Sequence, residues 1–244
     1  MSAPASAPLP DRHPLDRPIW SALAGRQSAL ALGHALARRI APDYGPFAAA
    51  LDDGPAALDA LRRLVPTGER VVLLQAGATV LPPGLVLERQ AAALQMVLTA
   101  LKSVGGSAAI EPLGPADAAE MRALADLTEP GPFARRTHEL GRFFGIRRGG
   151  RLIAMAGERL QPAGFVEVSG VCTHPDHRGR GYAGELMAAV INGILARRET
   201  PFLHVYVTNT GAIALYRALG FVPRCEVTVS TLSAPGAGFA GLSP

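Results

Sequence analysis

Apolar residues along the chain repeat with the spacings of helices and strands, most clearly in the second half. Residues 181–198 carry apolar side chains at intervals of three and four, which places them on one face of a helix. These residues are Ala183, Leu186, Met187, Val190, Ile191, Ile194 and Leu195. Pro201 prevents the helix from continuing. The pattern therefore predicts a helix over residues 181–198 that packs on a core.

The neighbouring segments predict a mixed sheet. In order they are a strand at 109–113, helices at 115–127 and 134–140, strands at 142–148, 151–160 and 164–173, the helix at 181–198, a strand at 202–208, a helix from Asn209 or Thr210 to Leu219, and a strand at 225–232. Short turns make the three central strands antiparallel, whereas the crossover through the helix at 181–198 requires the strands on either side of it to be parallel. We expect an α/β (α+β) fold with a mostly antiparallel sheet flanked by helices.

The first half of the chain has a weaker pattern. Residues 21–40 and 56–65 are expected to be helical, residues 70–75 form a buried strand, and residues 88–101 fit either a helix or a strand. Gly105-Gly106 marks a boundary or a bend. We divide the chain into a disordered lead-in at 1–18, an accessory N-terminal α/β unit at 19–104, a main domain at 105–232 and a flexible tail at 233–244.

Composition excludes several classes of protein. The net charge is +4, and the basic residues are spread along the chain without a block or an aromatic-rich basic patch, so no nucleic acid partner is expected. No apolar run approaches the ~18 residues of a membrane helix, and residues 1–18 have no apolar signal-peptide core. Cys172 and Cys225 are too few for a disulfide framework. The sequence therefore predicts a cytoplasmic protein without a membrane partner.

A glycine-rich loop at residues 178–184 lies between a predicted strand and the helix at 181–198. Glycines let a ligand approach the backbone, and the helix N-terminus adds partial positive charge, so the loop suits a phosphate or pyrophosphate. Residues 179–184 match the dinucleotide pattern G-x-G-x-x-G, which would indicate an NAD(P)-linked oxidoreductase. However, six residues, 173–178, precede the first glycine, which in dinucleotide folds directly follows the strand. This gap counts against a dinucleotide; the competing ligand is coenzyme A, which the resemblance described next implies.

Two motifs resemble those of the GCN5-related N-acetyltransferase (GNAT) superfamily. Residues 178–183 are similar to its pyrophosphate loop, R/Q-x-x-G-x-G/A. Further residues are similar to its last conserved block, namely Asn209, Ala214, Leu215, Tyr216, Gly220 and Phe221. Residues 171–175 resemble the FR47-like branch, which is related to glycine N-acyltransferases. The resemblance covers about residues 110–232.

This resemblance implies acetyl-CoA as co-substrate, held where two strands of the sheet splay apart. The pantetheine arm would pair with the backbone of Val171, Cys172 and Thr173. The pyrophosphate would meet backbone N–H groups of Gly179, Arg180, Gly181, Tyr182, Ala183 and Gly184. Arg178 and Arg180 would add positive charge, and Asn209 is either a cofactor contact or a helix cap.

The resemblance also implies direct attack of a primary amine on the thioester in a ternary complex. Glu167 stands eleven residues before Arg178 and is expected to be the base, its pKa raised by partial burial; the alternative is a surface residue or one that orients substrate. Tyr216 would protonate the thiolate, unless it is a core tyrosine. A backbone N–H near Val171 or Cys172 would bind the oxyanion.

The remaining polar residues have weaker roles. Thr137 and His138 are expected to contact the acceptor, a small-molecule or peptide amine. His174, Asp176 and His177 are read as a solvated turn, so no metal is expected, and Cys172 is not required as a nucleophile. A homodimer is left open. A non-catalytic CoA-binding regulatory module remains the alternative function.

Overall fold

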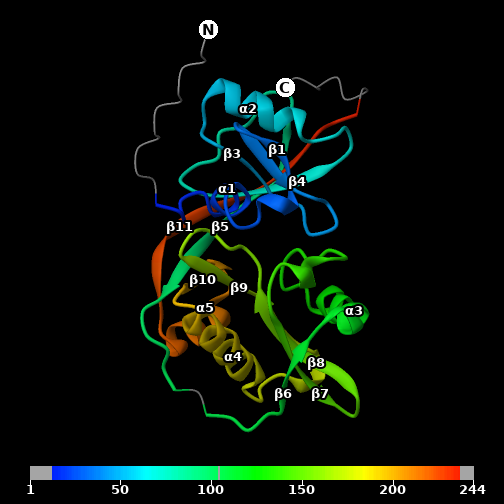
Figure 1. Cartoon of the computed structure of the whole chain (residues 1–244), viewed down its shortest axis with the longest axis vertical. Helices are drawn as coiled ribbons and strands as arrows, with labels where there is room; N and C mark the ends of the chain where they lie inside the picture. The colour runs from blue at the N-terminus through cyan, green and yellow to red at the C-terminus, as the bar shows by residue number, and fades with distance from the viewer. Residues whose placement is uncertain (1–12, 104, 237–244) are drawn as a thin grey trace.

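The computed structural model describes residues 13–103 and 105–236. Its main element is an eight-stranded sheet in the order β4-β11-β5-β10-β9-β8-β7-β6 (Figure 1). These strands are β4 (Arg70–Ala76), β5 (Val86–Leu98), β6 (Ile110–Leu113), β7 (Phe143–Arg148), β8 (Arg151–Glu158), β9 (Phe165–Thr173), β10 (Thr200–Tyr206) and β11 (Phe221–Ser233). β9 and β10 are parallel, while the other neighbours are antiparallel, as predicted.

Helices cover both faces of this sheet. α4 (Tyr182–Ala196) buries five residues of its predicted apolar face, whereas Ala183 is half-buried and Leu195, next to the last residue of the helix, is 42% exposed. α3 (Ala118–Thr128) packs through Met121 and Leu124. On β8, Met155 belongs to the core cluster of α3 and the next residue, Ala156, to the cluster of α4. Because successive residues of a strand point to opposite faces, the two helices lie on opposite sides of the sheet.

Most elements predicted in the second half are confirmed. The short helix predicted at 134–140 is a single 3-10 turn, η3 (Thr137–Glu139), and another 3-10 turn, η2 (Pro115–Asp117), precedes α3. α5 (Thr210–Leu219) ends at Gly220, and β11 begins directly after it. The segment at 88–101, which fitted either a helix or a strand, is β5.

The helix predicted over residues 21–40 is wrong. The structure has instead α1 (Pro18–Ala24), η1 (Ser28–Leu30), β1 (Ala31–His34) and β2 (Ala37–Ile40), and β3 (Ala48–Ala50) completes a small three-stranded sheet. Alanine and leucine favour a helix, but Gly25 follows the end of α1 and Gly33, with φ +88°, stands beside the hairpin turn. Burial of Ile40 against α1 and β4 then favours the strand.

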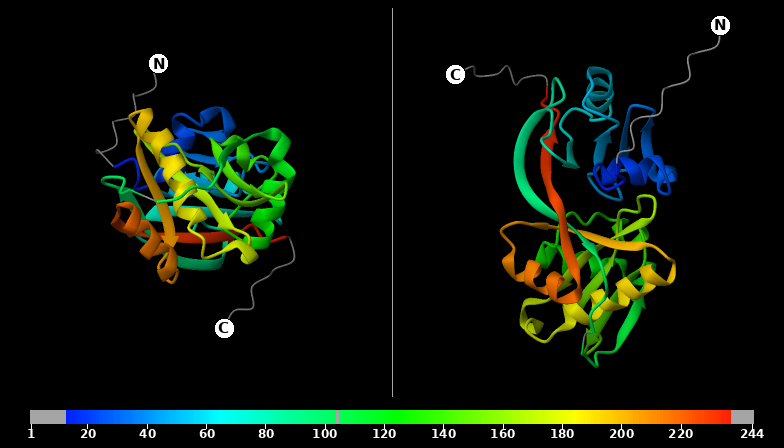
Figure 2. Two further views of the ribbon diagram at one scale, coloured as in Figure 1. Left: turned by 90° about the horizontal axis from the view of Figure 1, so that it is seen from below. Right: turned by 90° about the vertical axis from the view of Figure 1, so that its left-hand side faces the viewer.

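The eight-stranded sheet contains strands from both predicted units. β5 precedes the boundary at 104/105, yet it pairs with β10 and β11. Figure 2 shows the two long strands, β5 and β11, side by side. The division into units stays a prediction. α2 (Pro55–Arg63) confirms the helix at 56–65. Among the residues that the structure describes, none of the helices has the length and apolar character to span a membrane.

The predicted lead-in and tail extend beyond the described residues, since 1–12 and 237–244 lie outside them. The described part of the lead-in belongs to the fold: the Leu15 side chain is fully buried, and α1 begins at Pro18. At the other end, Ala234 is also fully buried. The ordered fold therefore begins earlier and ends later than predicted.

Candidate functional site

The sheet opens between β9 and β10. The two strands pair in parallel at three positions, ending at Phe202 opposite Glu167. Beyond this point β10 stays paired with β5 up to Tyr206, and β9 stays paired with β8 up to Thr173. The two strands therefore diverge, and backbone groups in the last part of β9 face the opening. This is the splayed sheet that the resemblance implied.

A β-bulge lies in β9 beside this opening. The pairing passes from Met155 opposite Cys172 to Gly157 opposite Ser169, so Gly170 and Val171 stand against one residue of β8. Gly170 has φ +62°, and a Cβ there would lie 2.9 Å from the Phe143 ring. Glycine is therefore required for both the backbone and the close approach. The bulge turns the backbone at Val171, where we predicted an oxyanion donor.

A hollow of about 360 Å³, which we call the main hollow, occupies the opening. It is lined by every predicted cofactor-contacting residue and by Tyr216. These residues are Val171, Cys172, Thr173, Arg178, Gly179, Arg180, Gly181, Tyr182, Ala183, Gly184 and Asn209. Four further lining residues were not predicted as contacts: Thr128, His177, Ala212 and Leu215. Ala212 lies four residues before Tyr216 and three before Leu215, and this helical spacing is the sequence signal that could have identified Ala212 and Leu215.

The glycine loop leaves backbone N–H groups available at the main hollow. Gly179 and Gly181 have φ +75° and +80°, and a Cβ at either position would meet no other atom within 4 Å. Glycine is therefore needed at these two positions for the backbone conformation, since a side chain would meet no steric obstacle there. Gly181 precedes α4, whose first-turn N–H groups have no carbonyl partner within the helix. Together with the helix dipole, these donors form an anion site.

This loop differs from a dinucleotide loop in its connection to the strand. After β9 ends at Thr173, the 3-10 turn η4 (Pro175–His177) intervenes before Gly179. In a dinucleotide fold the first glycine lies in the tight turn directly after the strand. The geometry therefore favours the coenzyme A interpretation of the loop.

Guanidinium groups lie close to the loop. Arg178 and Arg180 are exposed, and Arg178 Nε donates to the Thr173 carbonyl at 3.3 Å. Arg148 donates to the Tyr182 hydroxyl at 3.5 Å and thereby lowers the pKa of that phenol. Arg148 comes from the β7–β8 hairpin, so no local motif pointed to it. Positive charge beside the N–H groups suits a polyanionic ligand.

Tyr216 and Asn209 reach the main hollow from α5. Burial raises the pKa of the Tyr216 phenol, so the phenol keeps its proton at neutral pH and is able to donate it. The Asn209 side-chain oxygen accepts a hydrogen bond from the Ala212 N–H at 3.2 Å. Asn209 is therefore the helix cap, as one of its two readings predicted, and it also lines the hollow.

The surroundings of Glu167 differ from our expectation. The residue is fully buried, and its carboxylate accepts two hydrogen bonds from Arg159, each 2.8 Å, and one of 2.7 Å from His204 Nδ1. Burial raises the pKa of this carboxyl, but Arg159 and His204 together hold it well below its ordinary value. The predicted raised pKa is wrong, because the ion pair outweighs desolvation. The catalytic role of Glu167 stays a prediction.

The hydrogen bonds around His204 define its tautomer. Arg224 donates to the Gln95 side-chain oxygen at 2.8 Å, which makes the amide nitrogen of Gln95 the partner of His204 Nε2 at 3.0 Å. That nitrogen also donates to the Leu15 carbonyl. In this arrangement Nε2 accepts from the Gln95 amide, and Nδ1–H donates to Glu167. A continuous polar network thus links Glu167 to residues of the first half.

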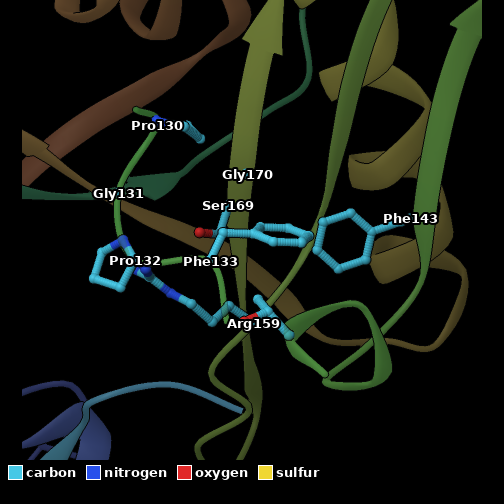
Figure 3. Close-up of a pocket in the computed structure, with 9 residues that line it drawn as sticks. Pro130, Gly131, Pro132, Phe133, Phe143, Arg159, Ser169 and Gly170 are labelled. Carbon is cyan, nitrogen blue, oxygen red and sulfur yellow. The ribbon is translucent and has the colours of Figure 1, made fainter. Parts of the chain in front are cut away.

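The predicted acceptor contacts lie on the other side of the bulge. Thr137 lines a second cavity, the small hollow, of about 10 Å³. Figure 3 shows other residues that line it, among them Phe133, Arg159 and Ser169. The Thr137 hydroxyl donates to the Tyr44 carbonyl and accepts from the Ala134 N–H, so the hydroxyl proton and one acceptor site are already used within the fold. His138 does not line either hollow. Their role as acceptor contacts stays a prediction.

Comparisons with known proteins agree with this architecture. Residues 143–229 match the FR47-like protein family. The chain is 44% identical to a protein described as an acetyltransferase from the GNAT family, from Novosphingobium aromaticivorans, with a TM-score of 0.86 over 92% of this chain and 100% of that one. A GCN5-related N-acetyltransferase from Kribbella flavida has a similar fold, at 21% identity and a TM-score of 0.59 over 91% of this chain and 96% of that one. The chain therefore belongs to the GNAT family of acetyltransferases.

One curated relative is similar over a shorter segment. The N-alpha-acetyltransferase RimI of Mycobacterium tuberculosis is 34% identical over 100 residues, which are 38% of this chain and 62% of that protein. The chain thus matches less than two thirds of the length of this relative. The similarity supports the family and leaves the acceptor open.

Proposed function

We propose that this protein transfers the acetyl group of acetyl-CoA directly to a primary amine in a ternary complex. The observation that carries the proposal is the main hollow, where the opened strand β9, the glycine loop and Tyr216 converge. The pantetheine arm would pair with the free side of β9 as an added strand does. The pyrophosphate would bind the N–H groups at the start of α4. Both polar parts of the cofactor, the pantetheine amides and the pyrophosphate, would thus find partners along the wall of the main hollow.

The proposed reaction uses the chain's own groups at two positions. The amine attacks the thioester carbonyl, and the oxyanion that forms accepts a hydrogen bond from the backbone at the bulge near Val171. Collapse of the tetrahedral intermediate breaks the carbon–sulfur bond, and Tyr216 donates its phenolic proton to the departing thiolate. The amine loses its proton to water or to a base, the role predicted for Glu167. Both products then leave without a covalent enzyme intermediate.

Binding of acetyl-CoA tests the proposal through the variant Gly181→Val. A β-branched residue is strongly disfavoured at φ +80°, so the loop should change conformation and its N–H groups should lose their alignment. We expect the Kd for acetyl-CoA to rise about 30-fold, measured by calorimetry, because each charge-assisted hydrogen bond contributes ~1.5 kcal/mol or more.

Gly150→Val is the matched control. Gly150 also has φ +80°, is exposed, and would place its Cβ without a neighbour within 4 Å, but it lies in the β7–β8 hairpin turn and does not line the main hollow. It should lose similar stability and keep its affinity for acetyl-CoA. Equal affinities in the two variants, or an unaltered protein that binds no acetyl-CoA, would refute the proposed function.

Cys172 offers a test of direct transfer. Burial raises the pKa of its thiol to about 11, so the thiolate is scarce at pH 8. We expect Cys172→Ala to keep the steady-state rate within about threefold, and mass spectrometry of the protein mixed with acetyl-CoA alone to find no acetylated cysteine. An acetyl group on Cys172 that amine removes would show a two-step mechanism instead.

A further inference from the structure

The small hollow adjoins the main hollow at the bulge of β9. Ser169 and Gly170 line the small hollow, and the next residue, Val171, lines the main one. On the opposite wall, Thr128 faces the main hollow and Pro130 the small one. Consecutive Cα atoms are only ~3.8 Å apart. A small molecule that spans this bulge would have groups in both hollows.

Arg159 directs one amino group of its guanidinium toward the small hollow. Nε and Nη2 donate to Glu167, which leaves Nη1 on the side of Gly131, 3.8 Å from the position of a Cβ at that residue. The Phe47 ring, with its centroid 4.8 Å from the guanidinium carbon, supports the group from the first half of the chain. Figure 3 shows the side chain extending toward Pro132, beside Ser169 and Phe133.

The chemistry of the small hollow selects an oxygen acceptor. Its volume suits one water-sized polar group. The Arg159 charge is balanced by the Glu167 carboxylate, so Nη1 offers directed N–H donors with little net charge, while the Thr137 hydroxyl is already engaged. Nη1 donates and cannot accept, so it would not bind an ammonium group but would donate to a carbonyl or carboxylate oxygen.

We propose that Arg159 Nη1 binds the carbonyl or carboxylate oxygen on the carbon next to the acceptor amine. The acceptor class is then the α-amino carbonyl compounds, such as an amino acid or a peptide with a free N-terminus. The oxygen occupies the small hollow, and the amine reaches over the bulge to the thioester in the main hollow. This inference rests on the proposed function, and it makes Arg159 a specificity-determining residue, held in place by Glu167 and Phe47.

The test compares matched amines that differ in one group. L-Alaninamide and isopropylamine share the amine and the methyl group, but only the first has the carbonyl. With acetyl-CoA saturating and rates expressed per free-base amine, we expect kcat/KM to favour the amide by at least about 10-fold, as a hydrogen bond to a charged donor provides. The same comparison applies to other amino acid amides and the amines in which a methyl group replaces the carboxamide.

Two variants remove the donor in different ways. R159M/E167Q replaces the ion pair with neutral side chains of similar size, and R159K keeps the charge opposite Glu167 without the Nη1 group. In both, the preference should fall to within about twofold of unity, with the Kd for acetyl-CoA unchanged. The control is R197M/E158Q, which removes another Arg–Glu pair, 2.8 Å long, that lines neither hollow and should keep the preference.

Each outcome separates the two proposals. Acetylation of both amines at equal efficiency by the unaltered protein would overturn the role of Arg159 and leave the transferase function intact. Retention of the preference in both Arg159 variants would do the same. If acetyl-CoA binds but no amine is acetylated, the transferase function fails, and the role of Arg159 fails with it.

Discussion

Glu167→Ala should lower the free energy of unfolding by about 3–5 kcal/mol, because it leaves the buried Arg159 guanidinium without its counter-charge. The carboxylate is fully buried, and both of its oxygens accept hydrogen bonds from Arg159. Urea denaturation followed by circular dichroism measures the change, provided that the transition is reversible and two-state. A loss below about 1 kcal/mol would contradict the buried ion pair.

The double variant R159M/E167Q is the control, because two neutral side chains leave no unpaired charge and should recover most of the stability. Acid provides a second readout. The pKa of Glu167 is lowered in the folded protein, so its stabilising contribution is present above the ordinary pKa of about 4.5 and is lost as pH falls below that value. The unaltered protein should therefore lose stability below pH 4.5 more steeply than R159M/E167Q.

Tyr216→Phe should lower kcat about 100-fold, since general acids contribute roughly 10²–10⁴-fold to such reactions. The phenol lines the main hollow and keeps its proton at neutral pH, so loss of the hydroxyl removes the donor while the ring remains. Stopped-flow detection of free thiol measures the rate, with a primary amine that the unaltered protein acetylates. The Kd for acetyl-CoA should change less than about threefold, because the ring still packs near Phe221.

Tyr206→Phe is the matched control for this substitution. Tyr206 ends β10, its ring is 40% exposed, and it does not line the main hollow. The kcat of Tyr206→Phe should equal that of the unaltered protein. If Tyr216→Phe keeps more than half of the original kcat, with chemistry shown to limit the rate, then Tyr216 is a packing residue and another group protonates the thiolate.

The sequence predicted the cofactor side of the site better than the acceptor side. The loop at 178–184 and the start of α4 are contiguous, so their glycines, helix start and apolar face could be interpreted locally. Arg148 and Arg159 have no local signal: Arg148 meets Tyr182 because α4 packs on the sheet, and Arg159 meets Glu167 because β8 pairs with β9. For the same reason, the alternation around Glu167 indicated partial burial but not the ion pair that lowers its pKa.

In parts of the first half of the chain, local sequence did not predict the secondary structure. Residues 21–40 are rich in alanine and leucine, which favour a helix, but long-range pairing of β1 with β2 and of β2 with β3 decides their conformation. β5 was ambiguous because only one end of it, Ala93 to Leu98, is buried, where it lies between β10 and β11, while Val86 and Leu87 at the other end are apolar but exposed. Such contacts between distant segments are not encoded in a short window of sequence.

The position of β5 has a consequence for how the two halves of the chain depend on each other. The strand is supplied by the first half of the chain, yet it completes the sheet beside β10, and Phe47 and Tyr44 from the same half contact Arg159 and the Thr137 segment. The two halves therefore cannot be exchanged as independent modules. If Arg159 binds the acceptor as proposed, substitutions of Phe47 or Tyr44, far from the glycine loop, would alter the choice of acceptor without touching the loop itself.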